Sequence, residues 1–150
     1  MRVGFDSNIL IYMAGGTVTA DRSKVERSLT LFGALVEDHE LVVPVQALGE
    51  ACRVLTGKFS LSAELVSRIL SEWEDSFVAS PTDIKTLRDA VELAGAHGLQ
   101  IWDAIILSAA SAAECSILLS EDMQHGFVWR GLTIINPFAA DPHPLLASLL

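Results

Sequence analysis

A chain of 150 residues has the length of one ordinary domain, and its hydrophobic fraction of 51% excludes a disordered protein, which would need low hydrophobicity and high charge. Charged or polar residues interrupt every apolar stretch, so the sequence predicts no membrane-spanning helix. An acid at position 6 stands where a signal peptide would be apolar, and we therefore expect a cytoplasmic protein.

The net charge of −9 bears on the choice of partners, because proteins that bind nucleic acid ordinarily show a basic surface. Acids clustered in one site would be neutralised by divalent cations, which then attract phosphate themselves. An acidic surface would also suit a basic partner protein. Composition leaves both interpretations open.

The cysteines and histidines form no recognisable disulfide or zinc motif. Cys52 and Cys115 lie in apolar segments without a CxxC spacing, and we expect them to be small buried hydrophobic residues. The histidines are scattered and show no paired spacing on a helix: His39, His97, His125 and His143.

The first half of the chain alternates between short apolar strands and amphipathic helices. Residues 2–6 are predicted to form a buried strand that ends in Asp6, and the helix that follows from Ser7 is ended by Gly15 and Gly16. We next expect a helix over 21–40, a strand over 41–43, and a helix over 44–55 that ends at Gly57. The apolar positions of the helix over 21–40 are Val25, Leu29, Phe32, Leu35 and Val36.

The second half continues the alternation. We expect a helix from Ser60 or Ser62 to about Trp73, a strand over 77–78, helices over 84–96 and 102–115, and strands over 117–119 and 132–135. This order predicts a single α/β domain over 1–150, with a mainly parallel central sheet of about four to five strands and helices on both faces. The apolar tail over 137–150 is expected to pack on the domain or on a second subunit.

Four acids stand where this fold would place a ligand. Asp6 ends the first strand and Asp122 follows the strand over 117–119, so both should lie at the edge formed by the carboxyl ends of the strands. Glu50 lies about two turns into the helix after the second strand. Asp103 begins an apolar helix. Each acid alone has an ordinary explanation as a cap or surface residue, and it is the arrangement that indicates a site.

Clustered carboxylates repel one another, which raises their pKa values unless cations bind. An all-carboxylate site without histidine or cysteine suits Mg²⁺ or Mn²⁺. Such metals lower the pKa of bound water and stabilise charge during in-line displacement at phosphorus. An aspartyl-phosphate mechanism also uses an Asp after the first strand. The dehalogenase-like phosphatases need a second Asp two residues later, where this chain has Asn8.

Four segments, in order along the chain, carry a resemblance to a known family: 3–12 (VGFDSNILIY), 43–50 (VPVQALGE), 101–106 (IWDAII) and 118–123 (LLSEDM). With them the chain resembles the PIN-domain family, and most closely the VapC-type toxin ribonucleases of prokaryotic toxin–antitoxin pairs. The resemblance implies a PIN fold, divalent-metal-dependent cleavage of RNA, a homodimer or higher homo-oligomer, and inhibition by a bound antitoxin. It makes Asp6, Glu50, Asp103 and Asp122 the catalytic metal ligands, directly or through water.

The resemblance also implies supporting roles for Asn8 and Ser120, whose amide and hydroxyl would orient carboxylates or water. Glu121 competes with Asp122 for the fourth ligand position. The family pattern favours Asp122, and we expect Glu121 to point to solvent. Arg53 would pair with Glu50, or else contact RNA or a dimer partner.

Other residues have weaker claims. Three basic residues are candidate phosphate contacts, although solvated positions explain them better: Lys58, Arg68 and Arg88. The tryptophans are candidates for base stacking, although core packing or an oligomer interface explains them better: Trp73, Trp102 and Trp129. The alternatives to a toxin ribonuclease are a catalytically silent PIN module that binds RNA or protein, and an RNA-processing PIN nuclease outside toxin–antitoxin systems.

Overall fold

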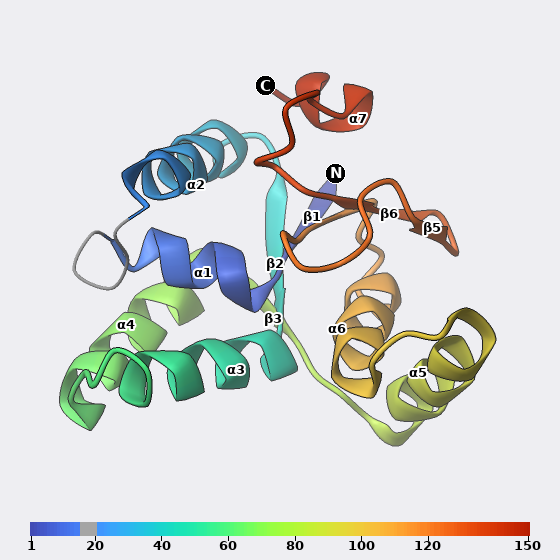
Figure 1. Ribbon diagram of the computed structural model, residues 1–150, viewed down its shortest axis with the longest axis horizontal. Coiled ribbons are helices and arrows are strands. Elements are labelled where there is room, and N and C mark those ends of the chain that lie inside the picture. The colour runs from blue at the N-terminus through green and yellow to red at the C-terminus, as the bar shows by residue number, and fades with distance from the viewer. Residues whose placement is uncertain (16–20) are drawn as a thin grey trace.

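A six-stranded sheet in the order β3-β2-β1-β4-β6-β5 forms the centre of the protein in a computed structural model that describes residues 1–15 and 21–150 (Figure 1). The strands are β1 (Arg2–Phe5), β2 (Glu40–Pro44), β3 (Val78–Ser80), β4 (Ile117–Leu119), β5 (Val128–Trp129) and β6 (Leu132–Ile135). All neighbouring pairs are parallel except the edge pair β5–β6. The predicted α/β class with a mainly parallel sheet is confirmed.

Helices cover the sheet on both sides. They are α1 (Ser7–Met13), α2 (Arg22–Leu35), α3 (Val45–Thr56), α4 (Ala63–Ser76), α5 (Ile84–His97), α6 (Ile101–Ala112) and α7 (Pro144–Ala147). Figure 1 shows α1 to α4 to one side of the sheet and α5 with α6 to the other. This layering buries both faces of the central strands, which explains why their sequences are apolar without alternation.

The strand order reverses at β1. The chain first extends the sheet from β1 through β2 to β3, and then returns to place β4 on the opposite side of β1. Val3 of β1 pairs with Leu41 of β2 and with Ile117 of β4. Open α/β sheets bind ligands at the carboxyl ends of the strands beside such a reversal, which here lies between β1 and β4. Gly4 permits the close approach of these strands, since a Cβ there would lie 3.1 Å from Leu118 Cδ1.

Capping residues explain where several of the helices begin and end. Asp21, Ser62 and Asp83 each accept a hydrogen bond from a backbone N–H in the first turn of α2, α4 and α5, respectively. Gly98 ends α5 in the left-handed conformation that a glycine adopts without strain. Gly15 follows α1 with a φ of +99°, whereas Gly16, the other predicted stop, lies outside the described residues.

The helix predicted over 21–40 is confirmed as α2. Of its apolar positions, Val25 and Leu35 are buried and Phe32 packs against the core, whereas Leu29 and Val36 are 47% and 40% exposed. The periodicity therefore predicts the helix but not which of its apolar residues are buried.

Several other boundaries differ from expectation. The third strand covers Val78–Ser80, because α4 continues to Ser76 and Phe77 is buried at the turn between them. α6 ends at Ala112, before a residue of positive φ, Glu114. β5 was not predicted, since its two residues give no alternating pattern.

The C-terminal tail contributes to the core through α7, whose Leu146 is buried in the main hydrophobic cluster. Within the described ranges, none of the helices is both long enough and apolar enough to cross a bilayer.

Candidate active site

Asp6 occupies the point where β1 becomes α1, and it is 3% exposed. Its Oδ1 accepts a hydrogen bond of 2.6 Å from the backbone N–H of Ser7. Its Oδ2 accepts from the hydroxyl of Ser120 at 2.7 Å and from Nδ2 of Asn8 at 3.2 Å. The carboxylate is therefore held by donors from β1–α1 and from the loop that follows β4.

Burial raises the pKa of Asp6 to about 6 from its ordinary 3.8. The hydrogen bonds from Ser120 and Ser7 oppose this rise, whereas the negative charges of Asp103 and Glu50 add to it. Asp6 thus lies within electrostatic reach of the acids that the sequence placed on α3 and α6.

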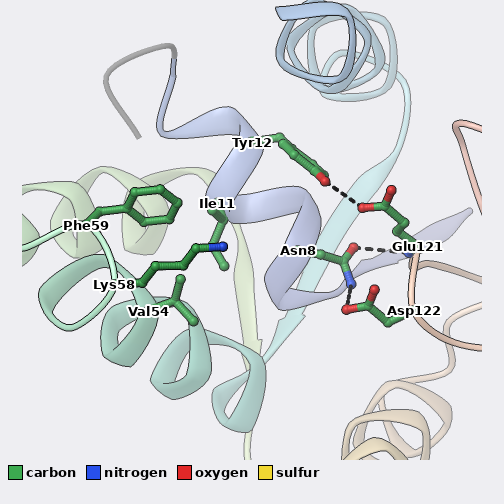
Figure 2. A pocket seen from close by; sticks show the side chains of 8 residues that line it. All are labelled: Asn8, Ile11, Tyr12, Val54, Lys58, Phe59, Glu121 and Asp122. Carbon is green, nitrogen blue, oxygen red and sulfur yellow. Dashed lines mark hydrogen bonds between the residues drawn. The ribbon is translucent and has the colours of Figure 1, made fainter. Parts of the chain in front are cut away.

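Asn8 connects two of the acids. Its Nδ2 lies 3.2 Å from Oδ2 of Asp6. The same Nδ2 lies 3.2 Å from Oδ2 of Asp122, and Oδ1 of Asn8 accepts a hydrogen bond of 3.1 Å from the backbone N–H of Glu121 (Figure 2). One amide on the first turn of α1 therefore fixes both the Asp6 carboxylate and the loop after β4. This placement fits the supporting role expected for Asn8.

Glu50 projects from α3 toward the first turn of α1. Ser7 Oγ lies 3.4 Å from its Oε2, and Nε2 of Gln46, one helical turn earlier, lies 3.1 Å from its Oε1. Ser7 and Gln46 were not singled out from the sequence, although the i, i+4 spacing of Gln46 and Glu50 is a recognisable signal.

Asp103 lies in the first turn of α6. Burial raises its pKa, and the charges of Glu50 and Asp122 raise it further. Asp6 is thus coupled to Asp103 and Glu50, and Asp103 to Glu50 and Asp122.

The donor set fits a hard divalent cation in its chemistry, because it consists of carboxylate oxygens supported by an amide and hydroxyls. In the arrangement seen, however, no three histidine, cysteine or acidic side chains among residues 1–15 and 21–150 lie close enough together to hold a metal ion. The acids therefore influence one another's pKa values, but they do not converge on a single metal-binding position.

The Glu121 side chain is directed to Tyr12 and Lys24 and is only 21% exposed, so it does not point to solvent, contrary to expectation. Its Oε2 accepts a hydrogen bond of 2.6 Å from the hydroxyl of Tyr12, and its Oε1 pairs with the ammonium of Lys24 (Figure 2 shows the Tyr12 contact). The pair raises the pKa of Lys24 to about 12. The charge of Glu121 is thus compensated at this point, whereas Asp122 faces Asn8 and Asp103.

The remaining candidates lie outside this network. Arg53 is exposed, and within the described part of the chain it forms no ion pair with Glu50. Trp102, beside Asp103, is 51% exposed and not packed in the core.

A cavity of about 210 Å³ adjoins Asp122, which alone among the four acids lines it (Figure 2). Its lining residues are Asn8, Ile11, Tyr12, Val54, Lys58, Phe59, Glu121 and Asp122. It therefore begins at the Asn8–Asp122 contact and extends along α1 to the end of α3.

Fold and site together define an α/β protein with a carboxylate cluster at the carboxyl edge of its sheet, next to the reversal of strand order. The chain belongs to the PIN domain family, whose sequence profile matches residues 4–126. That match spans every acid of the cluster. No curated protein matches the chain.

Solved structures share the fold. A toxin–antitoxin complex from Klebsiella pneumoniae is similar with a TM-score of 0.64 and 19% identity over 91% of this chain and 98% of that one. VapBC2 from Rickettsia felis, bound to a DNA fragment from its promoter, is similar with a TM-score of 0.60 and 18% identity. That match covers 80% of this chain and 87% of the other. Mycobacterium tuberculosis VapC20, a sarcin–ricin loop cleaving toxin, is similar with a TM-score of 0.64 and 10% identity. That match covers 80% of this chain and 89% of the other.

Proposed function

We propose that this protein is a Mg²⁺- or Mn²⁺-dependent endoribonuclease that acts as the toxin of a type II toxin–antitoxin pair. The observation that carries the proposal is the buried Asp6 carboxylate at the carboxyl edge of a PIN-domain sheet, which Asn8 links to Asp122. The pKa shifts of Asp6 and Asp103, to which Glu50 contributes, support it. The similar structures include toxin–antitoxin complexes and a toxin that cleaves the sarcin–ricin loop, which supports both parts of the proposal.

In this proposal Asp6, Glu50, Asp103 and Asp122 hold the metal, directly or through water. A divalent cation bound there supplies an activated water and stabilises negative charge on the phosphate oxygens. The chain contributes orientation. Ser120 and the Ser7 N–H hold the Asp6 carboxylate, and Asn8 holds Asp6 and Asp122 at a fixed separation.

The acidity of the chain supports an antitoxin partner with a basic surface, since a net charge of −9 favours association with positive charge. An RNA substrate is itself negatively charged and is repelled by the four acids. In this proposal it approaches them only when bound cations neutralise their charge, so RNA cleavage depends on metal.

A homodimer is also proposed. The helix α5 exposes apolar side chains on one face, with Ile84 71% exposed, Leu87 36% and Val91 57%. These positions are spaced as one helical stripe, and such a stripe in a soluble domain is suited to a second subunit. Sedimentation of the purified protein tests this directly.

A catalytically silent PIN module is the second candidate, because the acids do not converge on one point in the arrangement seen. The test is cleavage of a mixed-sequence single-stranded RNA with Mg²⁺ or Mn²⁺, with and without EDTA. Asp103→Asn removes one proposed ligand, and Asp38→Asn makes the same change at an exposed acid outside the cluster.

Cleavage by the wild type and Asp38→Asn, abolished by EDTA and by Asp103→Asn, is the expected result. Cleavage that persists in EDTA and in Asp103→Asn overturns the metal mechanism. Absence of cleavage by the wild type with either metal favours the silent module. Growth arrest on expression, relieved by Asp103→Asn, tests the toxin role separately.

A further inference from the structure

The cavity beside the acids has two chemically different ends. At one end are Asn8 and Asp122, which belong to the acidic site. At the other end are Lys58 and Phe59, which follow α3, and between the two ends lie apolar side chains of α1 and α3. The cavity thus continues the acidic site onto a surface of opposite charge and greater hydrophobicity.

Lys58 brings a positive charge to this surface. Its Nζ lies 5.5 Å from the centre of the Phe59 ring, and Lys58 forms no ion pair with any residue in 1–15 or 21–150. Figure 2 shows its ammonium end directed across the cavity toward the side that carries Asn8 and Asp122. On a strongly acidic protein, a cation without an ion pair in the cavity that Asp122 also lines offers a phosphate group a favourable contact.

The wall that carries Lys58 is preorganised. The backbone N–H of Phe59 donates to the carbonyl of Val54 at 3.2 Å, and that of Leu61 donates to the carbonyl of Leu55 at 3.0 Å. Phe59 is half-buried against the core, so its ring has a fixed position beside the cavity. A fixed aromatic ring next to a cation is the combination that single-stranded nucleic-acid sites use for base and phosphate.

We propose that this cavity binds the nucleotide next to the scissile phosphodiester of a single-stranded RNA, with Lys58 at its phosphate and Phe59 at its base. At about 210 Å³, the cavity is smaller than the roughly 300–1,000 Å³ of sites for drug-sized ligands, which suits one nucleobase. This inference rests on the proposed ribonuclease function and adds a determinant of substrate binding to it.

The test uses a fluorescently labelled, mixed-sequence single-stranded RNA and the full chain. Lys58→Gln removes the charge and keeps the stem, and Phe59→Leu keeps an apolar side chain without the aromatic face. Lys85→Gln makes the same charge change at an exposed residue of α5 and is the matched control. Thermal unfolding of each variant shows whether it is folded.

Two measurements are made on each protein. Cleavage with Mn²⁺ gives kcat and KM, and fluorescence anisotropy in EDTA over a range of salt concentrations gives the binding constant and its salt dependence. We expect Lys58→Gln to lower the slope of log K against log salt by about 0.7 and to raise KM about fivefold at 0.1 M salt, with kcat little changed. We expect Phe59→Leu to raise KM by about fivefold or more at an unchanged salt slope.

The outcomes separate the two proposals. If the wild type cleaves RNA and both variants match Lys85→Gln in KM and in salt slope, the nucleotide site is overturned and the ribonuclease stands. If the wild type cleaves nothing but binding falls with Lys58→Gln as expected, the ribonuclease fails and the cavity remains an RNA site. Variants that leave both RNA measurements unchanged but no longer bind a co-expressed partner protein assign the cavity to that protein and overturn the proposal.

Discussion

The hydroxyl of Ser120 lies 2.7 Å from Oδ2 of Asp6, and both side chains are buried where β1 and β4 end side by side. The same Ser120 oxygen accepts a hydrogen bond of 3.3 Å from the backbone N–H of Met123. One hydroxyl therefore fixes the carboxylate on β1 and the loop that carries Asp122. The sheet register brings these residues together, although they are 114 positions apart in the sequence.

Removal of the Ser120 hydroxyl should lower metal affinity markedly and the stability of the folded protein only moderately. We expect Ser120→Ala to lower the free energy of unfolding by about 2 kcal/mol, since two buried hydrogen bonds are lost, one of them to a carboxylate. The pKa of Asp6 should rise further, because Ser120 stabilises the charged form. Metal affinity, measured by titration calorimetry with Mn²⁺, should fall about tenfold.

Ser108→Ala is the matched control for this change. Ser108 is also buried, but its Oγ has no hydrogen-bond partner among the described residues, so its removal costs no contact. Equal metal affinity in the two alanine variants would contradict the role given to Ser120.

Asp6 should make the metal-free protein less stable at neutral pH than in mild acid. Its folded-state pKa of about 6 exceeds the ordinary value of 3.8, so the folded state binds more protons between these values and stability falls as the pH rises through them. The full cost above that window is roughly 3 kcal/mol. We expect Asp6→Asn to stabilise the protein by about 1–2 kcal/mol at pH 8 in EDTA, because part of the hydrogen bonding is lost with the charge. Urea unfolding at pH 8 and pH 4 measures both values.

Asp83→Asn provides a comparison in which the expected change in stability at pH 8 has the opposite sign. A hydrogen bond from the backbone N–H of Thr86 lowers the pKa of Asp83, so its contribution to stability is present above pH 4 and is lost in acid. Asp83→Asn should therefore destabilise the protein at pH 8. The interpretation of Asp6 fails if Asp6→Asn is no more stable than the wild type at pH 8.

The sequence could predict those parts of the site that follow from local patterns and strand ends. Asp6 and Asp122 follow β1 and β4, and parallel strands place their carboxyl ends at one edge. Asp103 stands in the first turn of α6, as its position before an apolar helix indicates. The mainly parallel sheet follows from the alternation of strands and helices.

The contacts of Glu121 could not be predicted in this way. Lys24 is 97 residues away on α2, and no periodicity or spacing connects two such positions. For the same reason the exposure of Leu29 does not follow from its helical spacing, because the rotation of α2 depends on what it packs against. Local patterns determine elements, and tertiary packing determines which side chains meet.

The pairing of Glu121 predicts that Glu121 and Asp122 differ sharply in function. Glu121→Gln should change cleavage less than about twofold and lower stability by less than about 1 kcal/mol, the range of a partly exposed ion pair. Asp122→Asn should lower kcat at least about 100-fold, because it removes a proposed metal ligand and leaves the Asn8 contact possible. Steady-state cleavage of one RNA by both variants measures the difference. The reverse order of effects would make Glu121 the fourth ligand.

Metal binding should stabilise the folded protein through the four acids. A ligand that binds the folded state alone raises the free energy of unfolding by about 2.7 kcal/mol at 100 times its Kd. The gain should be larger at pH 8 than at pH 5, since Asp6 must lose its proton to bind a cation, and its metal-free pKa is about 6. Thermal unfolding at increasing Mn²⁺ concentration, at both pH values, measures the effect. Asp103→Asn should lose most of the stabilisation and Asp83→Asn should keep it, because Asp83 caps α5 and lies outside the acid cluster. An equal gain in both variants would place the cation elsewhere on this acidic protein.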